Sequence, residues 1–327
     1  MTSRCAVVTG ASGFLGAHVV RRLLDLGRSV RVLVRSDAQR AKLPTGAIDV
    51  VVGDLRDESS MAGLCRDADV VFHLGTTMAF GLTDSDLRDV NVGGTERVIQ
   101  LAIADQVPRF VLVSSGGVHH NPFGEPLDEA STCAPENVYL ESKLEAEAIA
   151  RRLYRSDPGR LTIVRPSLVY GPGDWRRVKL WRAVARGYFV MVGPGTTFIH
   201  PVYCEDLVDG LLLAAGDRGR GETFLLGGPQ ALTLRAFVNE IAHAAGRSLL
   251  PLRIPARPVQ LAAALCESVC RPFGLSPPLS ARRLSFFLKH RRYDIRKARA
   301  MLGYDPPTGV ADGVRRTLSW YRERGWL

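Results

Sequence analysis

The sequence predicts a doubly wound α/β fold, in which a parallel sheet is covered by helices on both faces. Short apolar runs alternate with longer helical stretches from residue 4 to about 165, and the runs are apolar throughout. A glycine-rich turn also follows the first run directly. The 327 residues are 46% hydrophobic and 23% charged, which suits a large folded core and argues against disorder.

The first half of the chain supplies six expected strands, with four expected helices between them. The strands are Cys5–Thr9, Val30–Val34, Ile48–Val52, Val70–Leu74, Phe110–Val113 and Leu161–Val164; the helices lie near 14–27, 57–66, 86–105 and 136–156. We therefore expect a dinucleotide-binding domain over residues 1–170.

The second half is less regular, because Pro and Gly punctuate it, as in Gly171-Pro172-Gly173. Some elements near 200–226 are expected to return to the sheet, and residues 171–327 to form a smaller, mostly helical substrate region. The expected helices lie near 175–187, 204–215, 232–245, 258–270, 279–289 and 309–325.

The turn Gly10-Ala11-Ser12-Gly13-Phe14-Leu15-Gly16 stands between a strand and a helix. In such a turn the first glycine permits the tight bend, the second admits a pyrophosphate, and the third lets the helix approach the sheet. The helix N-terminus then favours negative charge. The turn therefore predicts dinucleotide binding.

The end of the second strand predicts which dinucleotide binds. An acid there would bind the ribose 2′-OH of NAD, whereas an arginine accepts the 2′-phosphate of NADP. Arg35 and Ser36 occupy this place, so NADP is preferred; Asp37 leaves NAD possible.

Tyr139 and Lys143 are four residues apart, which places both on one face of a helix. A nearby ammonium group favours the phenolate and so brings a tyrosine toward the pKa range of acid–base catalysis. Ser114 and Ser115 follow the strand Phe110–Val113, at the sheet edge where such folds place their site.

Together these motifs resemble the extended short-chain dehydrogenase/reductase family, the NAD-dependent epimerase/dehydratase superfamily with a Rossmann fold. Further stretches are typical of that family: Gly53-Asp54-Leu55, His73-Leu74-Gly75-Thr76, Asn91-Val92-Gly93-Gly94-Thr95, Tyr139 to Glu147, and Arg165-Pro166-Ser167 to Asp174.

The resemblance implies Tyr139 as the acid or base, with Lys143 lowering its pKa and holding the nicotinamide ribose. Ser115 would bind the substrate oxygen, and Asn91 would have a supporting role. The implied cofactor-binding residues are Gly10, Ser12, Gly13, Phe14, Leu15, Gly16, Arg35, Ser36, Asp54, Leu55, Leu74, Gly75, Thr76, Lys143, Pro166 and Ser167. No metal site is expected.

Within the family, the apolar stretch 254–288 resembles 3β-hydroxysteroid dehydrogenase-like and ketone reductase members. It predicts an oxidoreductase acting on an apolar, alicyclic alcohol or ketone. A sugar-nucleotide epimerase remains an alternative, although Thr197 stands where the epimerase pattern often carries arginine. Gly116-Gly117 replaces the Asp-Glu pair of the dehydratases. A non-catalytic, cofactor-sensing protein is a lesser alternative.

The formal charge is +10, and residues 281–301 carry most of the excess, with eight basic residues against Asp294. No nucleic-acid motif accompanies them, so we expect at most a weak peripheral membrane contact. We also expect a cytoplasmic enzyme and, by resemblance, a homodimer through the helices at 86–105 and 136–156.

Overall fold

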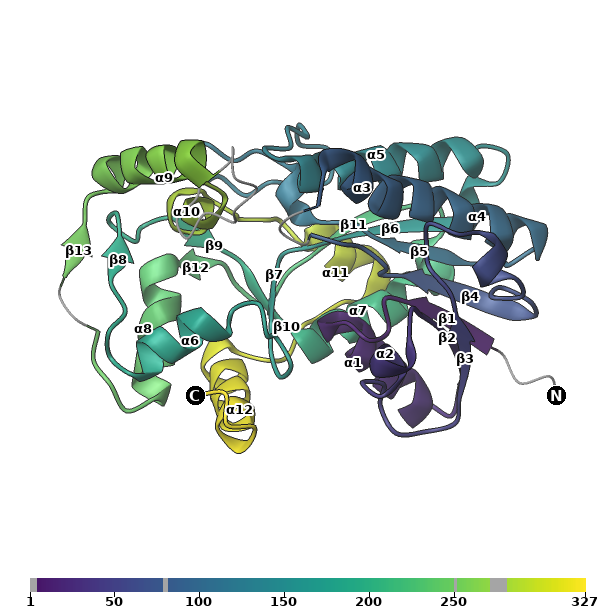
Figure 1. The fold of residues 1–327 in the computed structure, drawn as a ribbon, viewed down its shortest axis with the longest axis horizontal. Coiled ribbons are helices and arrows are strands. Elements are labelled where there is room, and N and C mark those ends of the chain that lie inside the picture. Colours follow the sequence, from purple (N-terminus) through teal and green to yellow (C-terminus); the bar gives the residue numbers. More distant parts are fainter. Residues whose placement is uncertain (1–4, 79–81, 250–251, 271–280) are drawn as a thin grey trace.

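The computed structural model describes residues 5–78, 82–249, 252–270 and 281–327, with only the backbone of 281–283. A central sheet with helices on both faces lies on one side of the molecule, and a mostly helical region lies on the other (Figure 1). The predicted fold class is confirmed.

Seven parallel strands form the central sheet in the order β11-β6-β5-β4-β1-β2-β3. The order reverses direction beside β1, and ligands of such sheets bind at this switch point, outside the carboxyl ends of the strands. The strands are β1 (Cys5–Thr9), β2 (Ser29–Val34), β3 (Ile48–Val52), β4 (Ala68–His73), β5 (Phe110–Val113), β6 (Leu161–Pro166) and β11 (Thr223–Leu226).

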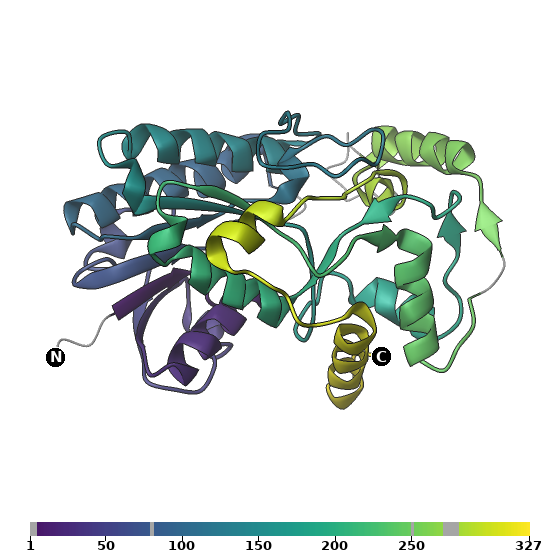
Figure 2. The same ribbon diagram turned by 180° about the vertical axis from the view of Figure 1, so that it is seen from behind.

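Two helical layers bury the faces of the sheet, as the two opposite views show (Figures 1 and 2). One apolar core joins the sheet to α1 (Phe14–Asp25), α7 (Cys204–Ala214) and α11 (Arg296–Leu302). A second core joins the other face to α4 (Gly94–Ala104) and α5 (Val138–Leu153). The strands read as continuous apolar runs because both faces are covered.

The C-terminal half has its own core around Trp181, whose side chain is fully buried. The rings of Tyr170, Phe237 and Tyr321 pack around it, the last two edge to face. These residues bring together α6 (Val178–Ala185), α8 (Leu234–Ala244) and α12 (Val310–Glu323). At the outer edge lie α9 (Ala256–Cys270) and α10 (Ala281–Leu288).

Three pairs of short strands complete the C-terminal half. They are β7 (Leu168–Tyr170) with β10 (Pro201–Tyr203), β8 (Met191–Val192) with β13 (Arg253–Ile254), and β9 (Phe198–Ile199) with β12 (Leu232–Thr233).

The six expected strands are confirmed with small shifts at their ends, but the expected helix at 57–66 is wrong. Only the 3-10 turn Ser59–Met61 forms there. The carboxylate of Asp57 accepts hydrogen bonds from the amide and hydroxyl of Ser59, which favours a turn over a helix, and Gly63 has a positive φ of 74°.

The expected helix at 86–105 is interrupted. It consists of α3 (Asp84–Arg88), a π-helical turn (Asp89–Gly93) and α4. Two further helices, α11 and the one-turn helix α2 (Asp37–Arg40), were not predicted from the sequence. Part of the expected helix at 279–289 lies outside the described residues. No helix in the described ranges is both long enough and apolar enough to cross a membrane.

Candidate active site

The glycine turn lies between β1 and α1, at the switch point of the sheet. Gly10 has a φ of 72°, and a Cβ atom there would stand 2.8 Å from the carbonyl carbon of Leu74 and 2.9 Å from the amide nitrogen of Gly75. A Cβ on Gly16 would lie 2.1 Å from the carbonyl oxygen of Gly10. Close packing by itself therefore requires glycine at positions 10 and 16.

Gly13 differs from the other two, because only the Gly10 carbonyl lies within 4 Å of a Cβ built there. Gly13 is the N-cap of α1 and supplies no capping side chain, and no acidic residue stands in the first turn. This leaves amide groups at the helix N-terminus to bind an anion. Ser12, Phe14 and Leu15 are partly exposed beside it. The turn fits the pyrophosphate of a dinucleotide.

The ends of β2 and β3 bring Arg35, Ser36 and Asp54 to the same edge of the sheet, beyond the carboxyl ends of the strands; Arg35 and Ser36 are exposed and Asp54 is partly exposed. Asp54 forms an ion pair with Arg56 at 2.9 Å, and this hydrogen bond lowers the pKa of the Asp54 carboxyl. Arg35 lies close enough to lower it further. Leu55 packs against Gly75 and Gly94, where a Cβ would come within 2.8 Å of its side chain.

A hydrogen-bond chain links β1 to the loop after β4. The Gly75 amide donates to the Thr9 hydroxyl at 3.0 Å, and that hydroxyl lies 2.9 Å from Nδ1 of His73. Nε2 of His73 lies 3.0 Å from the hydroxyl of Thr95, which donates to the Asn91 carbonyl at 2.6 Å. These partners assign the proton to Nε2. Burial lowers the pKa of His73 to about 3, so the ring is neutral.

Asn91 continues this chain to the helix α5. Its side-chain oxygen accepts from the Thr76 hydroxyl at 2.9 Å and the Thr77 amide at 2.7 Å. Its amide nitrogen donates to the Thr77 carbonyl and to the hydroxyl of Ser142, at 2.9 and 3.0 Å. Asn91 is 1% exposed and lies in the π-helical turn. Its side chain holds the 76–77 loop against α5.

Tyr139 and Lys143 both lie on α5, which Asn137 caps by accepting from the Leu140 amide. The Ser142 hydroxyl donates to the Tyr139 carbonyl at 2.8 Å, so the chain from β1 ends at the backbone of the predicted acid–base residue. Tyr139 is half-buried, whereas Lys143 is 2% exposed. Burial lowers the pKa of Lys143 to about 8, against the opposing charge of Glu147.

Glu147 lies one helical turn beyond Lys143 and is fully buried. Arg165 of β6 binds it with two hydrogen bonds, at 2.9 and 2.7 Å. Burial tends to raise the pKa of the Glu147 carboxyl, but the Arg165 partner holds it below its usual range. Arg165 also donates to Nε2 of His119 at 3.0 Å. Sequence reasoning missed this pair as part of the site, although Glu147 and Arg165 fall within two quoted motifs.

Ser115 follows β5 and caps the 3-10 turn Gly116–Val118 by accepting from the Gly117 amide at 3.1 Å. A Cβ on Gly117 would lie 3.0 Å from the side chain of Leu140, which neighbours Tyr139, and 3.3 Å from the Ser115 hydroxyl. The Ser115 loop therefore packs on the first turn of α5. Ser114 is 6% exposed, whereas Ser115 is partly exposed.

The end of β6 adds Pro166 and Ser167. The Pro166 carbonyl packs near Gly116, and the Ser167 amide donates to the Leu226 carbonyl at 2.8 Å. The Ser167 hydroxyl is buried without a hydrogen-bond partner in the described part of the chain. An unsatisfied hydroxyl at this edge fits a position where a bound ligand supplies the partner.

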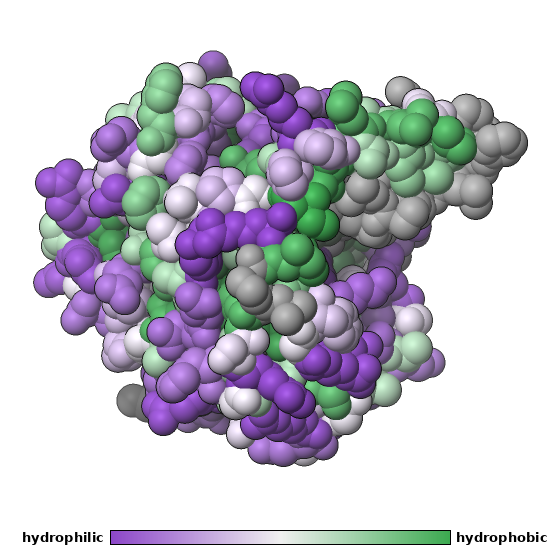
Figure 3. Space-filling view, turned by 90° about the vertical axis from the view of Figure 1, so that its left-hand side faces the viewer, coloured by the Kyte–Doolittle hydropathy of each residue, from purple (hydrophilic) through white to green (hydrophobic). Residues whose placement is uncertain are grey.

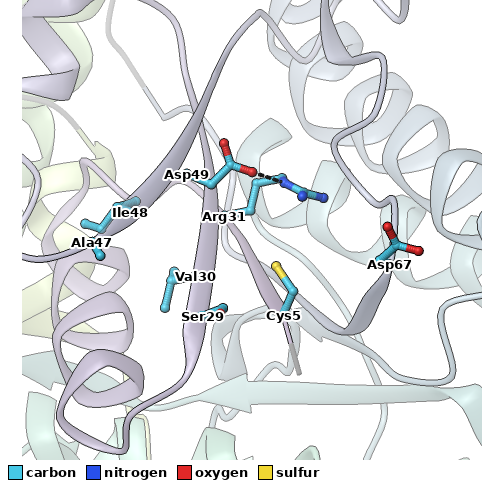
Figure 4. A pocket seen from close by; sticks show the side chains of 8 residues that line it. All are labelled: Cys5, Ser29, Val30, Arg31, Ala47, Ile48, Asp49 and Asp67. Atoms are coloured by element: carbon cyan, nitrogen blue, oxygen red, sulfur yellow. Dashed lines mark hydrogen bonds and ion pairs between the residues drawn. The ribbon is translucent and has the colours of Figure 1, made fainter. Parts of the chain in front are cut away.

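The opposite edge of the sheet is different. An open depression lies at the amino ends of β1, β2 and β3, and Figure 4 shows Arg31 turned toward Asp49 within it. These two residues form an ion pair, and Arg31 also binds three backbone carbonyls. The Arg31 guanidinium therefore has a structural role, because its charge is paired with Asp49 and its N–H groups bind the backbone. Among the described residues, no three His, Cys, Asp or Glu side chains gather as metal ligands.

Residues 6–227 match the model of the NAD dependent epimerase/dehydratase family. The chain is 31% identical to "Sterol demethylase protein B" of Methylococcus capsulatus, over 98% of this chain and 99% of that protein. It is 30% identical to the "4-hydroxy-2-methyl-3-oxo-4-farnesyl-3,4-dihydroquinoline-1-oxide ketoreductase" of Stigmatella aurantiaca, over 91% and 90%.

Among solved structures, the chain resembles DesIV, a dTDP-glucose 4,6-dehydratase from Streptomyces venezuelae, with NAD bound. The TM-score is 0.78 and the identity 26%, over 98% of both chains. The same family is indicated by the glycine turn, by the strand order and by these matches. The chain belongs to the NAD dependent epimerase/dehydratase family, the extended short-chain dehydrogenases/reductases, and is an NAD-dependent enzyme of that family.

Proposed function

We propose that this protein is an NAD(P)-dependent oxidoreductase that interconverts a secondary alcohol and a ketone on an apolar or alicyclic substrate. The main support is the packing of the Ser115 loop on the first turn of α5, where Tyr139 and the buried Lys143 lie one helical turn apart. This packing supports Tyr139 as the proton donor, Ser115 as a second hydroxyl donor and Lys143 as the neighbouring cation.

The nicotinamide ring, when bound, supplies or accepts the hydride. In the direction of reduction, the Tyr139 hydroxyl donates its proton to the substrate carbonyl oxygen, and the Ser115 hydroxyl donates a hydrogen bond to the same oxygen. The Lys143 ammonium stabilises the tyrosinate left behind. In oxidation the same groups act in reverse, with Tyr139 as the base.

For the cofactor we propose binding along the glycine turn, with the adenosine end at Arg35, Ser36, Asp54 and Leu55 and the nicotinamide end at Leu74, Gly75, Thr76, Lys143, Pro166 and Ser167. Arg35 and Ser36 favour the 2′-phosphate of NADP. Asp54 is already paired with Arg56. Arg35 is therefore more available than Asp54 to bind the adenosine end of the cofactor.

The apolar substrate is supported by the relatives, since one is a sterol demethylase protein and another reduces a ketone that carries a farnesyl chain. The C-terminal half, residues 171–327, would bind this substrate. The alternative is a sugar-nucleotide epimerase. The likeness to DesIV supports a sugar-nucleotide substrate, although DesIV is a dehydratase and not an epimerase. Thr197 weakens this alternative, because its hydroxyl donates to the Phe287 carbonyl and no arginine stands in its place.

The test is oxidation of NADPH or NADH by the purified protein with a panel of steroid, alicyclic and prenylated ketones. We expect turnover of at least one ketone, and a loss of about 10³-fold in kcat for Tyr139→Phe. Cofactor binding by the variant, measured by fluorescence, should be unchanged.

Turnover that survives Tyr139→Phe would contradict the proposed role of Tyr139. Thermal stabilisation by UDP-sugars, together with 4-epimerisation and no ketone reduction, would support the alternative. The homodimer through α4 and α5 stays a prediction, as does the cytoplasmic location; light scattering of the purified protein measures the former.

A further inference from the structure

Helix α9 exposes an apolar face at the outer edge of the C-terminal half. Leu261, Leu265 and Val269 are 73%, 66% and 56% exposed, and their spacing of four residues places them on one face. Pro258 and Ala262 are exposed on the same face by helical geometry, whereas Ala263, on the opposite side, is 1% exposed. The helix therefore packs by one side and presents an apolar side to the exterior, with the exposed Arg257 one turn before Leu261.

The concentration of apolar surface here is unusual for this molecule. Thirteen large apolar side chains are exposed in the described residues, and five of them fall within 252–269. Three of these five are Leu261, Leu265 and Val269, and the other two are Ile254, in β13, and Leu252, just before it. In Figure 3, which views the side where α9 lies in Figure 1, apolar colour gathers at the upper right. Single exposed apolar residues are ordinary, but a clustered group marks an interaction surface.

The charge around this face identifies the partner. Residues 252–292 contain eight basic residues and one acid, Glu267. Arg253 in β13 and Arg257 in the first turn of α9 are exposed, and α10, which packs beside α9, precedes Arg292. Lys289 forms an ion pair with Glu136, and Arg291 donates to the Ser285 and Lys289 carbonyls, so these two add less to the surface charge. Arg282 and Arg283 belong to the same charge excess, but their side chains lie outside the described residues. A positive surround repels a second copy of itself and attracts an anionic surface.

We propose that the apolar face of α9 and its basic surround bind the surface of an anionic lipid membrane. The helix lies in the interface, with Leu261, Leu265 and Val269 inserted between the headgroups. The arginines contribute attraction to acidic lipids. The glycine turn and the catalytic helix lie in the sheet half, away from α9, so the enzyme binds the membrane without blocking its cofactor site (Figure 1).

The experiment is co-sedimentation of the full-length protein with vesicles of phosphatidylcholine alone or of phosphatidylcholine with 30% phosphatidylglycerol. We expect binding to the anionic vesicles at least tenfold tighter than to the neutral ones, weakening as salt is raised. The triple variant L261S/L265S/V269S should bind at least tenfold less than the wild type, and R253E/R257E should bind less in proportion to its lost charge.

The matched control is L26S/I103S/L213S, which changes three exposed apolar residues at the C-cap of α1, on α4 and on α7, and it should bind like the wild type. Thermal melting and cofactor binding establish that each variant is folded. Absence of vesicle binding, equal binding to both vesicle types, or undiminished binding of the α9 variant each overturns the proposal. A dimer that the α9 variant dissociates, without vesicle binding, would identify a second copy as the occupant instead.

Discussion

The two ends of the proposed cofactor site are built in contrasting ways. At the nicotinamide end, Lys143, His73 and Asn91 are nearly inaccessible, and a continuous hydrogen-bond chain ties β1 to α5. At the adenosine end, Arg35 and Ser36 are exposed and Asp54 forms an ion pair with a half-exposed Arg56. Buried polar groups tolerate little change, whereas exposed charges are screened by water. We infer that reaction chemistry is fixed at one end and that cofactor preference is adjustable at the other.

The contrast is tested most sharply by neutralising one buried carboxylate and one exposed carboxylate and comparing the loss of stability. Glu147→Gln leaves Arg165 buried without its counter-charge and should cost about 3–5 kcal/mol of the free energy of unfolding. Glu141→Gln, on the same helix, affects an exposed pair with Arg88 and should cost less than about 1 kcal/mol. Urea unfolding measures both. Equal costs would show that the nicotinamide end is no more rigid than the surface.

The glycine turn provides a second test with a matched control. Gly10→Ala combines a left-handed φ of 72° with contacts of 2.8 Å to the backbone of Leu74, and should cost about 3 kcal/mol and abolish cofactor binding. Gly27→Ala has a φ of 69° but nothing within 4 Å of the new Cβ, so about 1 kcal/mol is expected. Thermal melts and cofactor titration measure the difference, and similar costs would contradict the close-packing argument.

The lowered pKa of His73 predicts that the free energy of unfolding depends on pH. Its folded-state pKa is lowered to about 3 by burial, below the unfolded value of about 6.5, so the unfolded state binds the extra proton between these values. Stability should therefore fall as the pH drops below 6.5, by about 2 kcal/mol from this group at pH 5.

In His73→Asn the slope of the unfolding free energy against pH should decrease by about one proton over pH 4–6, measured by urea unfolding at several pH values. An unchanged slope would mean that His73 is protonated in the folded state.

The smallest effect is expected at the adenosine end. Arg35→Asp should shift the NADPH/NADH preference about tenfold or more toward NADH, with little change in the melting temperature, because Arg35 is exposed. Arg21→Asp, at an exposed position on α1, is the charge-matched control and should leave the preference unchanged. If the Arg35 variant keeps the wild-type ratio, the NADP preference is wrong.

Local patterns in the sequence predicted much of the sheet half. The apolar strands, the glycine turn and the pair Tyr139 and Lys143 are signalled by periodicity and by spacing along one element. The helix expected at 57–66 was wrong because side-chain hydrogen bonds of Asp57 and the backbone of Gly63 decide that segment. These two effects act over a few residues. They do not alter the spacing of apolar residues from which the helix was predicted.

The sequence by itself determined the strand order along the chain in the sheet half and indicated the residues that we propose for the chemistry, because these depend on local propensity and short spacings. Only the tertiary structure decided which buried partners those residues have. Glu147 meets Arg165 across two elements, and Asn91 joins the 76–77 loop to Ser142. The exposure of one face of α9 was also decided there, since the sequence of an apolar helix does not say which of its sides the rest of the chain covers.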